Sequence, residues 1–123
     1  MEKFLNIPLH YGIKSMIDIE NMKCIVEQEI KKRHFESLHY VLFDENKNLP
    51  WAFHLFYRDG KFMINGRDDR SYIIGKTWEF ANFEEAKFFF IKKMTDFIRL
   101  NRLEIKTGHE PYYSSPLWDK TDN

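Results

Sequence analysis

The chain has 123 residues, of which 43% are hydrophobic and 17% aromatic, and its 19 basic and 19 acidic side chains give a formal net charge of zero. This length and composition are typical of one globular domain over residues 1–123, with a single hydrophobic core and no disordered linker. A balanced charge gives no overall field to concentrate nucleic acid or anionic lipid, so we expect neither nucleic acid nor a membrane as a partner.

Cys24 is the single cysteine, which excludes an intramolecular disulfide and a thiolate-rich zinc site. It stands among apolar residues at helical spacing, so we interpret it as a buried structural thiol rather than a nucleophile. The N-terminal residues contain no long apolar segment and no small-residue cleavage pattern, which argues against a signal peptide and a membrane span. We therefore expect a cytoplasmic protein.

The first predicted element is a helix that begins at Ser15 or Asp18, either of which could cap it, and ends near His34. Basic residues in its last turn meet the negative end of the helix dipole. The apolar stripe that predicts this helix consists of Ile19, Met22, Ile25, Val26 and Ile30.

Four runs rich in aromatic and β-branched residues follow, and they predict short strands within residues 37–45, 51–59, 61–66 and 71–80. The first connection contains ENKNLP, and the second is Asp59-Gly60, a two-residue hairpin signal because both positions tolerate positive φ. The third connection covers residues 66–70. Connections this short favour an antiparallel meander, because parallel neighbours need a crossover of about a dozen residues or more.

A second helix is predicted after Asn82, the expected N-cap, with Glu85 at the capping-box spacing and Gly108 just beyond the end. The predicted order is helix, four-stranded antiparallel meander sheet, helix and an aromatic C-terminal tail, which is an α+β fold. The apolar stripe of the second helix consists of Phe83, Ala86, Phe90, Met94, Phe97 and Ile98.

The predicted sheet is apolar on both faces. If two helices cover one face, the other still carries Phe43, Phe56 or Met63. A contiguous apolar patch usually marks a contact, and three candidates could cover it: the aromatic tail, a second copy of the chain in a homodimer, or a different protein.

The segment Arg67-Asp68-Asp69-Arg70 allows three interpretations. The favoured one is a solvated turn whose charges offset one another, each exposed pair contributing roughly 0 to 1 kcal/mol. A partner-binding patch comes second. A catalytic or metal-binding pair comes third, because adjacent strand residues point to opposite faces and their carboxylates converge only if the turn bends them together.

No other pattern indicates catalysis. The five histidines are scattered without a metal-binding motif, the serines lack a GxSxG elbow, and the glycines do not form a phosphate-binding loop before a helix. We therefore expect no enzymatic activity, no cofactor and no bound metal.

The first helix, the runs WAFHLFYRDGKFMI and RSYIIGKTWEFANFEEAKFFFIKKM, and the closing YYSSPLW together resemble the small immunity proteins of bacterial polymorphic toxin systems. The closest resemblance is to the immunity protein 59 family, over residues 15–118. It implies a cytoplasmic, non-enzymatic protein that binds and neutralises one cognate toxin domain, usually encoded next to it, either by plugging its active site or by holding it inactive. The alternatives are a binding or dimerisation module unrelated to toxins and, third, an enzyme that uses Asp68, Asp69 and a histidine.

Aromatic residues beside arginine and aspartate are typical of the centre and rim of a tight protein interface. We therefore expect the toxin contacts among residues of the sheet, the Arg67 to Arg70 segment and the tail. The candidates are Trp51, His54, Arg67, Asp68, Asp69, Arg70, Tyr72, Tyr112, Tyr113 and Trp118.

Overall fold

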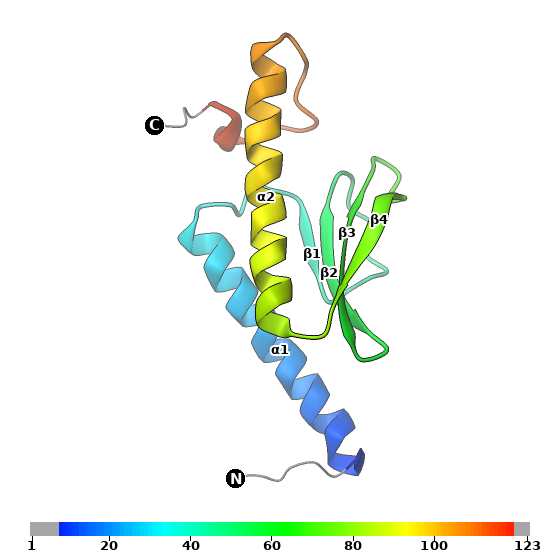
Figure 1. The fold of residues 1–123 in the computed structure, drawn as a ribbon. Helices are drawn as coiled ribbons and strands as arrows, with labels where there is room; N and C mark the ends of the chain where they lie inside the picture. The colour runs from blue at the N-terminus through cyan, green and yellow to red at the C-terminus, as the bar shows by residue number, and fades with distance from the viewer. Residues whose placement is uncertain (1–7, 120–123) are drawn as a thin grey trace.

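A computed structural model describes residues 8–119, with side chains from residue 18 onward (Figure 1). Helix α2 packs against strands β2, β3 and β4, and α1 packs against α2, so the predicted α+β class is confirmed. The elements are α1 (Pro8–Lys32), β1 (Tyr40–Leu42), β2 (Phe53–Arg58), β3 (Lys61–Arg67), β4 (Ile73–Phe80), α2 (Phe83–Lys106) and a 3-10 helix, η1 (Pro116–Asp119).

Helix α1 begins at Pro8, so the predicted start at Ser15 or Asp18 is wrong. The side chain of Ser15 lies outside the described residues, as do residues 120–123 of the predicted tail. The end is close to the prediction, because His34 adopts a left-handed φ of 61° and the Phe35 amide donates to the Ile30 carbonyl at 2.9 Å. This closes the helix in the manner of a Schellman motif.

Cys24 is exposed on α1, so the prediction of a buried thiol is wrong. Val26 and Ile30, four residues apart, form the fully buried stripe of this helix. Cys24 precedes Val26 by two residues and therefore lies on a different part of the helical circumference.

The four strands lie in the order β1-β2-β3-β4. The β2–β3 and β3–β4 pairs are antiparallel as predicted, but β1 runs parallel to β2, so the complete antiparallel meander is wrong. Strand β1 is much shorter than its predicted run because Phe43, with a φ of 55°, ends it after Leu42. Residues 43–52 form the crossover, and these ten residues are slightly fewer than the number expected of a connection between parallel strands, about a dozen.

The predicted local signals in the second half of the chain are confirmed. Asp59 and Gly60 both have positive φ, at 54° and 81°, and join β2 to β3 in a two-residue turn. The Asn82 side chain accepts a hydrogen bond from the Glu85 amide at 3.0 Å at the start of α2. At its end, Gly108 has a φ of 100° and donates its amide to the Ile105 carbonyl.

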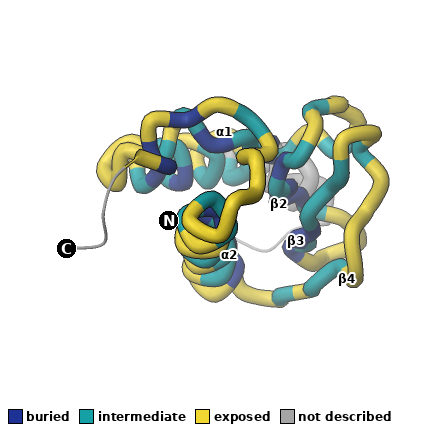
Figure 2. The backbone as a smooth tube through the Cα atoms, turned by 90° about the horizontal axis from the view of Figure 1, so that it is seen from above, coloured by how far each residue is buried: buried dark blue, intermediate teal, exposed yellow. Residues whose placement is uncertain are grey.

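The core lies between the helices and one face of the sheet. Leu55 and Ile64, paired across β2 and β3, are fully buried on this face. They join a cluster with the buried stripes of both helices and the tail: Val26, Ile30, Ala86, Phe90, Met94, Ile98, Leu117 and Trp118. Figure 2 shows buried positions on β2, β3 and the helices, whereas the start of β4 is exposed.

The second face of the sheet is covered by the β1–β2 connection, which is none of the three expected candidates. Residues 43–52 pass behind the sheet in the view of Figure 1. Asp44 and Asn46 of this connection line a pocket together with Phe56, and Phe56 and its neighbour His54 are buried. A connection between parallel strands must cross one face of the sheet, and the helices occupy the other.

Candidate partner-binding surface

Three segments that are distant in sequence meet at one end of the sheet. The Trp51 amide, at the end of the β1–β2 connection, donates to the Asp68 carbonyl in the β3–β4 loop at 3.1 Å. The Trp51 ring also stacks on Tyr112 of the tail, with ring centroids 4.6 Å apart. We call the residues gathered here that retain solvent exposure the loop-end surface: Trp51, Arg67, Asp69, Arg70, Tyr72 and Tyr112.

Asp68 organises the β3–β4 loop. Its amide donates to the Tyr72 carbonyl at 2.9 Å, and its Oδ1 accepts hydrogen bonds from the Arg70 amide at 2.8 Å and the Tyr72 amide at 3.0 Å. Ser71 has a left-handed φ of 67°, which completes a three-residue hairpin loop with a left-handed third residue. These contacts support the turn interpretation for Asp68, while the Asp69 side chain is exposed to solvent.

The two arginines of this segment differ in their surroundings. The Arg67 Nε donates to the Asn65 Oδ1 at 2.8 Å, and the Asn65 Nδ2 donates in turn to the Thr77 Oγ1 at 3.0 Å. Partial burial, with a smaller contribution from Arg58, lowers the pKa of Arg67. Arg70 is exposed, so its guanidinium is the more accessible of the two.

Most of the tail aromatics belong to the core. The Tyr113 hydroxyl accepts a hydrogen bond from the His39 amide at 3.1 Å, and its ring stacks on His39 at 3.7 Å. Burial raises the pKa of Tyr113. The Trp118 Nε1 donates to the Tyr113 carbonyl at 2.6 Å, and Trp118 is buried. Tyr112 retains 41% exposure, so it is the tail aromatic that reaches the surface.

His54 lies in the interior instead of on a surface. It is 0% exposed, and within the described part of the chain neither ring nitrogen has a hydrogen-bond partner. Burial, aided by the positive charge of Arg67 and opposed by Asp44, lowers the pKa of His54 to about 4. His54 and Trp118 are therefore placed where a rigid partner could not touch them, and we leave them out of the loop-end surface.

Sequence reasoning missed two exposed residues beside this surface. Ile73 and Ile74, at the start of β4, are each 51% exposed and follow Tyr72, which is 67% exposed. A usable signal was present, because three consecutive apolar residues in a strand cannot all face one core when side chains alternate between faces.

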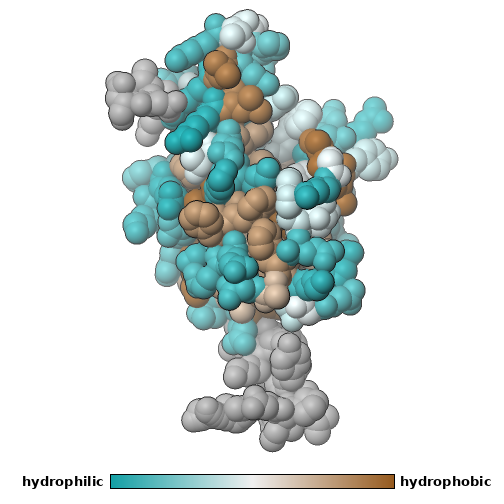
Figure 3. Space-filling view, in the orientation of Figure 1, coloured by the Kyte–Doolittle hydropathy of each residue, from teal (hydrophilic) through white to brown (hydrophobic). Residues whose placement is uncertain are grey.

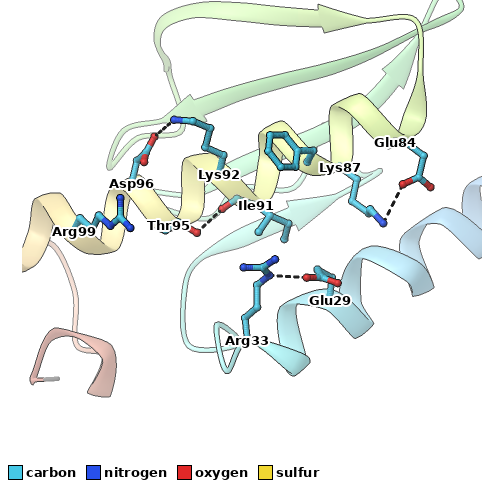
Figure 4. A pocket seen from close by; sticks show the side chains of 10 residues that line it. Glu29, Arg33, Glu84, Lys87, Ile91, Lys92, Thr95, Asp96 and Arg99 are labelled. Carbon is cyan, nitrogen blue, oxygen red and sulfur yellow. Dashed lines mark hydrogen bonds and ion pairs between the residues drawn. The ribbon is translucent and has the colours of Figure 1, made fainter. Parts of the chain in front are cut away.

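A second surface feature, lined mostly by charged residues, lies between the helices. A groove of about 550 Å³ between α1 and α2 contains Ile91 and Phe88, which is 72% exposed. Figure 3 shows hydrophobic residues on this side of the molecule, and Figure 4 shows the groove itself. Most of its charged side chains pair with one another: Arg33 with Glu29 at 2.6 Å, Lys87 with Glu84 at 3.2 Å and Lys92 with Asp96 at 3.0 Å. The groove therefore offers no convergent set of unpaired polar groups to fix a small ligand.

Two further properties bear on function. Within residues 8–119, no group of three or more of the described histidine, cysteine, aspartate or glutamate side chains, which begin at residue 18, is arranged to hold a metal ion. None of the helices in that same range is long and apolar enough to span a bilayer.

A family model described as immunity protein 59 matches residues 19–119, which extend from α1 to the end of η1 and include the whole sheet. Comparisons with curated proteins and with solved structures give no match. The matched segment contains the loop-end surface and the helix groove, and it covers most of the chain. The chain belongs to the immunity protein 59 family.

Proposed function

We propose that this protein binds one cognate bacterial toxin domain in the cytoplasm and neutralises it by direct contact, without catalysing a reaction. The family match over residues 19–119 is the observation that carries this proposal. Immunity proteins act by binding, so the chain needs a stable surface of suitable chemistry and no reactive centre.

The loop-end surface has the composition expected of such a contact. Trp51, Tyr72 and Tyr112 provide aromatic area, and Arg67 and Arg70 provide guanidinium groups. Tryptophan, tyrosine and arginine contribute most of the binding energy in protein interfaces.

The loop-end surface is also held in place before binding. Asp68 fixes the loop through two hydrogen bonds to its carboxylate, and the stacked rings of Trp51 and Tyr112 join the connection to the tail. Preorganised contacts lose less conformational entropy on association. Asp68 thus holds the loop, and Tyr113 and Trp118 pack on Phe97, on which Tyr112 also stacks, while His54 lies in the interior. The toxin contacts are made by Arg67, Asp69, Arg70 and the exposed aromatics.

Coexpression tests the proposal. The toxin domain encoded by the neighbouring gene should kill cells when expressed alone, and this protein should restore growth and copurify with the toxin. Continued killing in its presence, together with a failure to copurify, would reject the immunity function.

A paired substitution tests the surface. Tyr72→Ala should weaken protection, whereas Phe88→Ala should not, because Phe88 has similar exposure but lies in the helix groove. Equal loss of protection in the two variants would place the contact elsewhere.

A further inference from the structure

The outer edge of β4 is available for pairing within the described sheet. Strand β4 is hydrogen bonded to β3 on one side and is the last strand in the order. Its first residues, Ile73 and Ile74, and the preceding Tyr72 are exposed and apolar. An exposed apolar edge can accept an added strand from another chain.

The backbone of Ile73 faces this open edge. The Asp68 amide donates to the Tyr72 carbonyl, so these two residues form a hydrogen-bonded pair across the hairpin. The next pair is Arg67 with Ile73, and the Arg67 amide donates in the other direction, to the Ala52 carbonyl at 2.9 Å. Because the pattern alternates along an antiparallel ladder, the Ile73 amide and carbonyl point away from β3.

Cations flank the exposed start of β4. Arg70 and Lys76 are exposed, and no carboxylate among the described residues forms an ion pair with either. The Lys76 Nζ lies 5.7 Å from the Trp78 ring centroid, and the Lys93 Nζ lies 4.2 Å from the same centroid. Two carboxylates, those of Asp68 and Asp69, stand beside the three cations Arg67, Arg70 and Lys76, so the edge carries a small excess of positive charge.

We infer that a short extended segment of the cognate toxin, with apolar and acidic side chains, adds as a strand to the outer edge of β4 at Ile73. This inference rests on the proposed function. The toxin backbone pairs with the Ile73 amide and carbonyl, its apolar side chains cover Tyr72 and Ile74, and its carboxylates face Arg70 and Lys76.

Charge favours this occupant over a second copy of the chain. An isologous dimer would place the same cationic edge on both sides of the interface, where the charges repel. Gly75, with a φ of 71°, accompanies a register shift between Ile64 and Gly66 on β3. Such a bulge interrupts the edge, which limits both the length of an added strand and edge-to-edge self-association.

A backbone-directed pair of variants tests the strand addition. Ile73→Pro removes the outward amide but keeps apolar volume, and Ile73→Val keeps the amide with a similar side chain. Affinity for the toxin domain encoded by the neighbouring gene should fall about tenfold in the proline variant, the loss expected for one hydrogen bond, and less than about threefold in the valine variant. Melting temperatures of both variants establish that they are folded.

Charge reversal provides a second test that does not depend on how the chain tolerates proline. Arg70→Glu and Lys76→Glu should each slow association with the toxin domain by about tenfold at low ionic strength, and by less at high salt. Lys47→Glu is the matched control, because Lys47 is exposed on the β1–β2 connection. It should leave the association rate unchanged.

The outcomes separate this inference from the proposed function. Suppose that the wild-type protein binds the toxin, but Ile73→Pro has the same affinity as Ile73→Val, and Arg70→Glu and Lys76→Glu associate as fast as Lys47→Glu. The strand addition is then rejected and the immunity function stands. If the wild-type protein does not bind the toxin, both are rejected. A stable dimer of the isolated protein at micromolar concentration, abolished by Ile73→Pro, would assign the edge to a second copy.

Discussion

The Trp51 amide donates a hydrogen bond to the Asp68 carbonyl at 3.1 Å, and this contact joins the crossover connection to the β3–β4 loop. Trp51 has a left-handed φ of 56°, a conformation that is costly for a bulky residue. The hydrogen bond and the stacking of its ring on Tyr112 hold it there. The loop-end surface therefore depends on tertiary contacts between segments as well as on the loop sequence itself.

Replacing Asp68 should destabilise the protein far more than replacing its neighbour. Asp68→Ala removes the acceptor for the Arg70 and Tyr72 amides, so we expect the free energy of unfolding to fall by about 1 to 2 kcal/mol. Asp69→Ala should change it by less than about 0.5 kcal/mol because the side chain is exposed. Urea denaturation measures both values, and equal values would contradict the turn geometry described for Asp68.

Ser71→Gly should stabilise the fold. Ser71 has a φ of 67°, where glycine has no steric cost, so the free energy of unfolding should rise by roughly 0.5 to 1 kcal/mol despite the greater flexibility of the unfolded chain. Ser114→Gly is the control, because Ser114 is exposed and does not have a positive φ. Thermal unfolding compares the two, and a lower melting temperature for Ser71→Gly than for the wild type would contradict the prediction.

His54 should make the free energy of unfolding decrease as the pH is lowered. Its pKa is lowered to about 4 in the folded state, against an unfolded value near 6.5. Between these values the unfolded state binds more protons, so the free energy of unfolding decreases as the pH falls from about 6.5 towards 4, by on the order of 3 kcal/mol in total. Below pH 4 this group contributes no further change.

His54→Leu removes the titrating group while keeping an apolar side chain at a buried position. The difference in unfolding free energy between wild type and variant should shift in favour of the variant as the pH is lowered from 7 to 5, a range above most carboxylate titrations. Parallel stability profiles for the two proteins over this range would mean that His54 is not titrating as described.

The tail should contribute to the core through Trp118 more than through Tyr112. Trp118 is buried, and its ring lies 5.9 Å from that of Phe97, edge to face. Trp118→Ala should therefore lower the free energy of unfolding by about 3 kcal/mol or more, and Tyr112→Ala by about 1 kcal/mol. Guanidinium denaturation measures the free energy of unfolding of both variants. A negligible effect of Trp118→Ala would show that the tail is not part of the core.

Local chemistry made much of the fold predictable. Asn82 and Gly108 mark the ends of α2 because capping and left-handed geometry depend on single residues, and Asp59-Gly60 marks a hairpin for the same reason. These features need no knowledge of distant segments.

The direction of β1 was not predictable from such signals. It depends on where Phe43 ends the strand and on the contact between Trp51 and Asp68, which joins residues far apart in sequence. The misassigned direction also explains why His54 was expected on a surface: the crossover buries it, whereas an antiparallel hairpin would not. The grouping of Trp51, the β3–β4 loop and Tyr112 agrees with the predicted candidate set, although the role of its members as toxin contacts stays a prediction.

The most direct test of the central claim is calorimetric titration of this protein with the purified toxin domain encoded by the neighbouring gene. We predict a one-to-one complex whose affinity is reduced at least about tenfold by Tyr72→Ala and is unchanged by Phe88→Ala. No binding by the wild-type protein, or an affinity that depends on Phe88 and not on Tyr72, would contradict it.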